Sequence, residues 1–173
     1  MVTSSVESYW EPSFDTLYDA CFYELASEQI ITSWSRIHIV SAVLTAIAAS
    51  GSAVSGWALW ADPHGKMVWG CIAAIASLLA VIHSVLGVPH RIKEEEDRRQ
   101  RFCALRIDLE TFRQNLLLRA DPVDSEKAFD GLRCRLRESV SKTPPDIVLS
   151  HAARRAVQDR VNEKLKKYIN GRA

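Results

Sequence analysis

The chain has 173 residues, enough for one domain of ordinary size, and a formal net charge of +1. Three blocks of different composition underlie this near-neutral average. Residues 1–35 hold six acidic and no basic residues, residues 37–88 are almost free of charge, and residues 90–173 hold 20 Lys and Arg against 14 Asp and Glu. Such segregation argues against an ordinary soluble globule and predicts a membrane protein of the all-α class.

The first block, residues 1–35, is predicted to be an acidic helix on the cytoplasmic side. Apolar side chains recur at helical spacing within residues 13–33. They are Phe14, Leu17, Cys21 and Leu25. This stripe predicts an amphipathic helix that packs on a partner.

Residues 36–89 are predicted to form a two-span transmembrane hairpin. Two apolar runs, at about 37–60 and 67–88, flank a loop at 61–66, and neither run contains Asp, Glu, Lys or Arg. Each run exceeds the about 20 helical residues that cross a hydrocarbon core of roughly 30 Å. Lys and Arg are concentrated after the second run, so the positive-inside rule places both termini in the cytoplasm.

Small side chains form a broad arc on each predicted span. The hydroxyl-bearing stripe of the first span is the predicted lining of any pore: Ser41, Thr45, Ala48, Ser52 and Ser55. The predicted packing positions are Ala42, Ala46, Ala49, Ala53 and Gly56 in the first span, and Gly70, Ala73, Ser77, Ala80, Ser84 and Gly87 in the second. Small residues permit the close packing and hydrogen bonds through which spans associate. Both hairpin-only packing and homo-oligomeric packing fit these arcs, and the second, polar arc of the first span favours a homo-oligomer.

Two features of the spans bear on a pore. Two helices enclose nothing, so a conduit requires several subunits in a ring, and the face of Ser77 and Ser84 competes with the first stripe as its lining. His38 and His83 are the ionisable groups near or within the spans, which makes them candidates for a pH-sensitive gate. Neutral histidine is tolerated near the interface, so a structural role is favoured over gating.

Residues 90–173 are predicted to form a basic cytoplasmic helical domain. Helices are expected at 91–119, about 124–140 and about 147–169, with a rigid linker at 142–146. The first of them carries a seam of two heptads, formed by Phe102, Leu105, Leu109, Phe112 and Leu116. Acid-before-base pairs such as Glu94→Arg98 suggest an exposed helix, so its charge run is predicted to be solvated surface rather than a metal or nucleic-acid site.

The last predicted helix has a basic face with three potential partners. Solvent, the anionic inner leaflet and the acidic N-terminal helix are each compatible with it. Because the charges of the first and third blocks are −6 and +6, docking within the chain is favoured. We expect raised salt to weaken this docking.

No sequence feature predicts enzymatic chemistry. The four cysteines are far apart and form no CxxC pair, so free thiols without a metal are expected. The chain contains no phosphate-binding GxxxxGK[ST] motif, no HExxH and no GxSxG. It is therefore predicted to be neither an enzyme nor a cofactor-binding protein, and no direct nucleic-acid binding is expected.

The order of acidic helix, Ser/Ala-rich hairpin and charged helix resembles the SLATT family, two-span proteins of bacterial conflict systems. The resemblance runs from "LYDACFYELASEQIITSWSRIHIV" through the hairpin to "EEEDRRQRFCALRIDLETFRQNLL", roughly residues 14–118. It implies a multi-pass effector of the bacterial inner membrane in antiphage defence (abortive infection). The family implies an upstream sensor protein or nucleotide signal, as in CBASS-like or retron operons, and no catalytic residues.

The predicted function is that of an oligomeric membrane effector that forms a regulated pore or disrupts the membrane. One alternative is a non-conducting membrane-anchored scaffold or adaptor whose helical bundle binds a signalling partner. A third is a subunit of a small housekeeping channel or transporter. The lipid bilayer and further copies of the chain are the expected partners in the favoured case.

Overall fold

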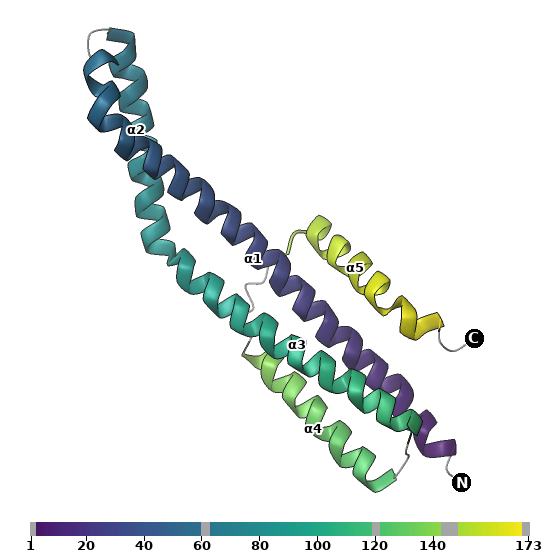
Figure 1. The fold of residues 1–173 in the computed structure, drawn as a ribbon. Coiled ribbons are helices and arrows are strands. Elements are labelled where there is room, and N and C mark those ends of the chain that lie inside the picture. The colour runs from purple at the N-terminus through teal and green to yellow at the C-terminus, as the bar shows by residue number, and fades with distance from the viewer. Residues whose placement is uncertain (1–2, 60–62, 119–121, 143–148, 171–173) are drawn as a thin grey trace. The chain divides into compact units, whose positions relative to one another are not determined.

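The computed structural model describes residues 3–59, 63–118, 122–142 and 149–170, which are almost entirely helical (Figure 1). Inside these helices, the side chains of residues 3–7 and 47–59, and of several positions in the second, fourth and fifth helices, are not described. The helices are α1 Thr3–Leu59, α2 Pro63–Leu86, α3 Val88–Leu118, α4 Pro122–Ser141 and α5 His151–Asn170. The predicted all-α class is confirmed.

The chain divides into two compact units. The hairpin unit is Ile31–Glu94, and the bundle unit combines Met1–Ile30 with Glu95–Ala173. These boundaries lie about five residues from the predicted ones at 35/36 and 89/90. Both α1 and α3 contribute to each unit, so the boundaries fall inside helices rather than in linkers.

Helix α1 is longer than the sequence pattern predicts, because it runs without a break from Thr3 and includes Pro12. Proline inside a helix removes a backbone hydrogen bond and costs roughly 3 kcal/mol. Neighbouring side chains hydrogen-bond within the same turns: the Thr16 hydroxyl donates to the Pro12 carbonyl at 2.7 Å, and Ser13 donates to the Trp10 carbonyl at 2.9 Å. Packing also offsets the cost, since the Tyr9 ring meets the edge of Phe129 from α4 at 5.9 Å.

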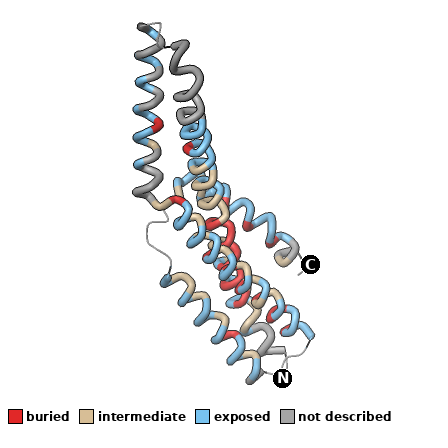
Figure 2. The backbone as a smooth tube through the Cα atoms, turned by 60° about the vertical axis from the view of Figure 1, so that its left-hand side comes forward, coloured by how far each residue is buried: buried red, intermediate tan, exposed pale blue. Residues whose placement is uncertain are grey.

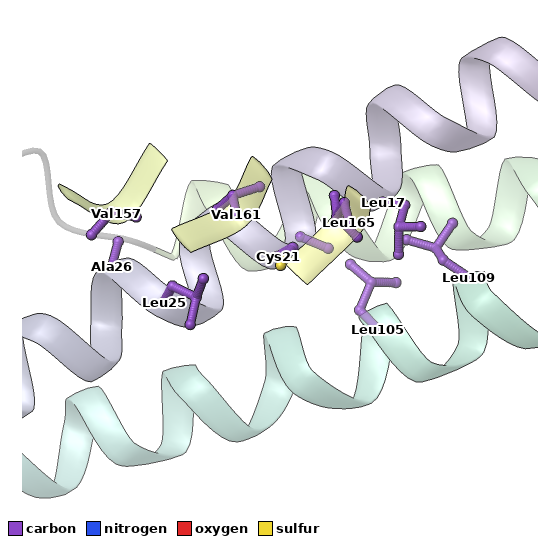
Figure 3. Packing of buried hydrophobic residues seen from close by; sticks show 10 residues of the cluster. Leu17, Cys21, Leu25, Ala26, Leu105, Leu109, Val157, Val161 and Leu165 are labelled. Atoms are coloured by element: carbon purple, nitrogen blue, oxygen red, sulfur yellow. The ribbon is translucent and has the colours of Figure 1, made fainter. Parts of the chain in front are cut away.

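The bundle core lies where α1, α3 and α5 meet, and Figure 2 shows buried positions gathered along this part of the chain. The close-up in Figure 3 shows the side chains that fill it: Leu17, Cys21, Leu25 and Ala26 from α1, Leu105 and Leu109 from α3, and Val157, Val161 and Leu165 from α5. A second cluster joins α3 to α4 through Phe112, Leu116 and Phe129, with the two phenyl rings stacked 5.6 Å apart. All five residues of the predicted α3 seam are therefore buried.

A glycine joins α2 to α3. Gly87 has φ of 55°, the left-handed conformation that ends many helices, and an L side chain there is strained. Its carbonyl accepts hydrogen bonds from the backbone N–H groups of His90 and Arg91, at 2.9 and 3.1 Å. Pro89 follows within the first turn of α3, where its missing N–H is tolerated.

Over the part of the chain that the structure describes, no helix is both long enough and apolar enough to cross a membrane. The prediction of two spans, at 37–60 and 67–88, is thus not supported by this finding.

Candidate functional site

Between 31 and 87, the described side chains that are buried are small and many of those that are exposed are bulky, whereas Val88 at the start of α3 is buried. Ser41 is 6 % exposed and Ala76 is 9 % exposed, and they are the inward-facing residues of α1 and α2 among the described side chains between 31 and 87. The large aliphatic side chains point outward: Ile37, Ile39, Val40, Val43 and Leu44 from α1, and Met67, Val68, Ile75, Leu78 and Val81 from α2. This pattern is the reverse of a water-soluble helical pair, in which the bulky apolar stripe is buried.

The described members of the predicted pore-lining stripe do not share one environment. Ser41 is buried and donates its hydroxyl hydrogen to the His38 carbonyl at 2.9 Å. Thr45 is exposed and donates to the Ser41 carbonyl at 2.8 Å. Both hydroxyl protons are thus used inside the helix, the behaviour expected of Ser and Thr in apolar surroundings. The side chains of Ala48, Ser52 and Ser55 lie outside the described residues.

The described packing positions face outward in the single chain. Ala42, Ala46 and Ser77 are exposed. A Cβ atom added at Gly70 would meet nothing within 4 Å, so no close approach inside the chain requires this glycine. A Cβ atom at Gly87 would likewise meet nothing within 4 Å, so its backbone conformation, rather than close packing, explains why glycine occupies this position. The other predicted packing positions and one histidine lie outside the described side chains: Ala49, Ala53, Gly56, Ala73, Ala80, Ser84 and His83.

Where α1 enters the hairpin unit, aromatic and ionisable side chains gather. The Arg91 guanidinium of α3 lies over the Trp34 ring at 5.7 Å, a cation–π contact that the sequence pattern did not predict. One turn beyond Trp34, His38 is half-buried and its carbonyl accepts the Ser41 hydrogen bond. Among the described residues, His38 belongs to no group of side chains that could hold a metal ion, and its role as a gate stays a prediction.

The bundle unit contains a buried ionic junction centred on Glu24 of α1. One carboxylate oxygen accepts a hydrogen bond from Arg106 Nε of α3 at 2.6 Å, and the other accepts from Lys164 Nζ of α5 at 3.2 Å. Arg106 also donates to Glu110 at 2.8 Å. Burial alone would lower the pKa of Arg106, but the hydrogen bonds and charges of Glu24 and then Glu110 outweigh it and raise the pKa. Glu24 therefore links three helices through charge-assisted bonds.

The acidic face of α1 and the basic face of α5 meet, as their opposite charges predict. Arg160 pairs with Glu28 at 3.0 Å, next to the Lys164–Glu24 pair. Tyr18 adds neutral hydrogen bonds: its hydroxyl donates to Asn162 at 3.3 Å and accepts from Gln158 at 3.1 Å. Burial raises the pKa of the nearby Cys21 thiol, which keeps it protonated and inert. All four cysteines are free thiols.

Two arginines of α3, Arg98 and Arg113, are buried, and for Arg98 this contradicts the prediction that its charge run is solvated surface. Arg98 pairs with Glu95 rather than with the predicted Glu94, whose partner is His90 at 3.3 Å. Arg113 is 2 % exposed and reaches α1, donating to the Trp10 carbonyl at 2.7 Å and lying 3.9 Å from the Trp10 ring. Partnered burial of this kind fixes how the helices register.

A hollow of about 230 Å³ lies between α3 and α4, with Leu105 among its lining residues and three cations around it. Arg135 pairs with Asp108, and Lys142 pairs with Glu138, each at 2.6 Å. Because acidic neighbours already neutralise two of these cations, the described residues give no argument for an anion site in the hollow.

Comparisons of the chain with protein-family models, with curated proteins and with solved structures find no match. The resemblance to the SLATT family therefore rests on the sequence pattern alone.

Proposed function

We propose that the chain is a membrane protein that self-assembles and forms a regulated pore or disrupts the bilayer. The observation that carries the proposal is the reversed burial among the described side chains of α1 and α2 between 31 and 87, where Ser41 and Ala76 are buried and large aliphatic side chains are exposed. In water each Å² of exposed apolar surface costs roughly 25 cal/mol, whereas lipid removes that cost. The absence of Asp, Glu, Lys and Arg from 37–60 and 67–88 supports the same environment.

The exposed small residues support assembly of several copies. Ala42, Ala46 and Ser77 face outward in the single chain. In lipid, helices associate through close backbone approach rather than through a hydrophobic driving force, and small side chains permit that approach. A ring of hairpins is the simplest arrangement that gives these positions neighbours and encloses a conduit.

The resemblance to the SLATT family adds a cellular role to the proposal. The chain acts as an inner-membrane effector of abortive infection, with both termini in the cytoplasm. An upstream sensor protein or nucleotide signal activates it through the bundle unit. No cofactor and no catalytic residue takes part.

Ion flux through liposomes that contain the purified protein tests this function, with the oligomer mass measured on the same sample. Flux from a discrete oligomer is the expected result. Thr45→Leu and Ser52→Leu should reduce flux and leave the oligomer mass unchanged, because each adds bulk to the predicted lining. Val43→Leu is the matched control, since Val43 is exposed and already aliphatic. Equal flux in all three variants would defeat the lining assignment, and a monomer without flux would defeat the pore.

A non-conducting scaffold is the second candidate. The observation that favours it is that the Ser41 and Thr45 hydroxyls are bonded to carbonyls of their own helix, which is also how such residues behave without a pore. A stable oligomer that carries no flux in the presence of its activating partner would support the scaffold instead.

A further inference from the structure

Helix α5 packs against the rest of the bundle unit along one stripe of its surface. Among its described side chains the buried ones are Val157, Val161 and Leu165, which form a single stripe at steps of four residues. Most other described positions of α5 are exposed. The helix therefore joins the core through this one stripe of three side chains.

The polar contacts of α5 are partly open to solvent. In the Arg160–Glu28 pair the side chains are 47 % and 43 % exposed, and Lys164 is 37 % exposed in its pair with Glu24. Ion pairs with this exposure contribute little individually and are weakened by salt. They specify where α5 docks more than they hold it there.

The remainder of the bundle has contacts of its own. Glu24 keeps its bond to Arg106, and Leu17 and Leu25 of α1 share the core cluster with Leu105 and Leu109 of α3. The cluster of Phe112, Leu116 and Phe129 joins α4 to α3 without α5. Separation of α5 is thus a local opening of the kind that occurs below the free energy of global unfolding.

When α5 separates, the rest of the bundle exposes a surface that favours one kind of helix. Its apolar strip is the part of α1 and α3 around Cys21, Leu25 and Leu109, and two carboxylates, Glu24 and Glu28, lie beside it. The complementary helix carries apolar residues at positions i, i+4 and i+8 and cations at i+3 and i+7. In α5 these positions are Val157, Val161 and Leu165, with Arg160 and Lys164.

We propose that this surface of α1 and α3 is a docking site for α5 of a second copy, so that subunits exchange this helix when they assemble. Every apolar contact and both ion pairs would be reproduced between copies, because the exchanged element is identical. Exchange of an identical element is a low-cost route to association. The inference rests on the proposed self-assembly, which brings copies to the effective concentrations at which an intermolecular contact competes with an intramolecular one.

Disulfide trapping in the full-length protein tests the exchange. The four native cysteines are replaced by Ala, and Glu28→Cys and Arg160→Cys are placed on separate chains that are mixed, reconstituted in liposomes and oxidised. A covalent dimer that contains one chain of each kind is the expected product, since these positions meet at the ion pair. A mixture of Asp15→Cys and Arg155→Cys chains is the matched control: both positions are exposed, and no covalent dimer is expected.

Oligomer mass is measured on the same samples, so that a failure of helix exchange can be told apart from a failure of self-assembly. A further sample carries Glu28→Cys and Arg160→Cys on the same chain. An oligomer in which the 28–160 bridge forms within that chain, but not between the singly substituted chains, overturns helix exchange and leaves self-assembly intact. A monomer overturns both. Should removal of the native cysteines unfold the protein, Glu28→Cys and Arg160→Cys are placed on separate chains that keep the native cysteines, and mass spectrometry looks for peptides linked between residues 28 and 160. Such a linked peptide is expected if exchange occurs, and its absence from the oligomer overturns exchange.

Discussion

Neutralising Glu24 is expected to lower the stability of the bundle unit far more than neutralising a surface glutamate. In Glu24→Gln the shape of the side chain is kept, and the negative charge that Arg106 and Lys164 share is lost. Glu24 is 7 % exposed, so water does not replace the missing charge. Lys164 lies at the surface and can turn to solvent, which leaves Arg106 as the affected partner.

The expected cost follows from the contacts that survive. Removal of one member of a buried ion pair costs about 3–5 kcal/mol when the other is left uncompensated. Arg106 still donates to Glu110 at 2.8 Å, and the Gln side chain still offers one acceptor, so roughly 2 kcal/mol is expected. For a domain of about 100 residues, such a loss lowers the unfolding midpoint by ~10 °C.

Thermal unfolding followed by far-ultraviolet circular dichroism, in one detergent for all variants, measures this difference. Glu138→Gln is the matched control, because Glu138 forms an equally short salt bridge, to Lys142, but both side chains are more than half exposed. The control is expected to leave the midpoint unchanged. If both variants shift the midpoint equally, the Glu24 junction is an ordinary surface pair and the argument from its burial is wrong.

Three further outcomes are expected. Gly87 has a left-handed backbone, so Gly87→Ala should lower the free energy of unfolding by about 1–2 kcal/mol. Gly131 lies inside α4, with φ below zero and open space around it, so Gly131→Ala should raise the free energy of unfolding by about 0.5–1 kcal/mol. Denaturant titration compares the two variants. Leu109→Ala should lower the free energy of unfolding by about 2–5 kcal/mol, whereas Ile107→Ala, at an exposed position, should change it by no more than about 0.5 kcal/mol. Equal losses in the two variants would contradict the α3 seam. Raising salt from 0.1 to 1 M, which shortens the screening length from about 10 to 3 Å, should speed amide exchange in α5 and leave that of α3 unchanged.

The sequence pattern predicts the bundle well where the signal is local. Apolar side chains at steps of three and four mark the buried face of a helix without any knowledge of its partner, and all five predicted seam residues of α3 are buried. The meeting of α1 and α5 was predictable from net charge, since −6 and +6 blocks attract at any register. Their register was not, because it depends on which individual side chains pair.

Contacts between distant residues account for what the pattern missed. Arg113 sits among the apolar residues of "TFRQNLLL", a placement that hints at burial, but its partners Trp10 and Ser13 are about 100 residues away. The Glu24 junction likewise needs three helices in place before its geometry exists. Helix continuity was missed for a different reason: periodicity shows which face is buried but not where a helix begins, so α1 through Pro12 appeared as a shorter segment.

Helix α1 follows opposite burial rules along its length. In the bundle unit it buries Leu17 and Leu25, and in the hairpin unit it exposes Val40 and Val43 and buries Ser41. One solvent cannot favour both halves, because water penalises the aliphatic surface of the second and lipid penalises the charged surface of the first. Under the proposed function, the two halves of α1 lie in these two different surroundings, the first in water and the second in lipid. Under that proposal Val40→Asp, which costs about 2.5–3.5 kcal/mol for a helix in lipid, should lower the fraction of protein that floats with liposomes and leave the bundle's unfolding midpoint unchanged. An unchanged floating fraction would place the hairpin's exposed face against protein instead.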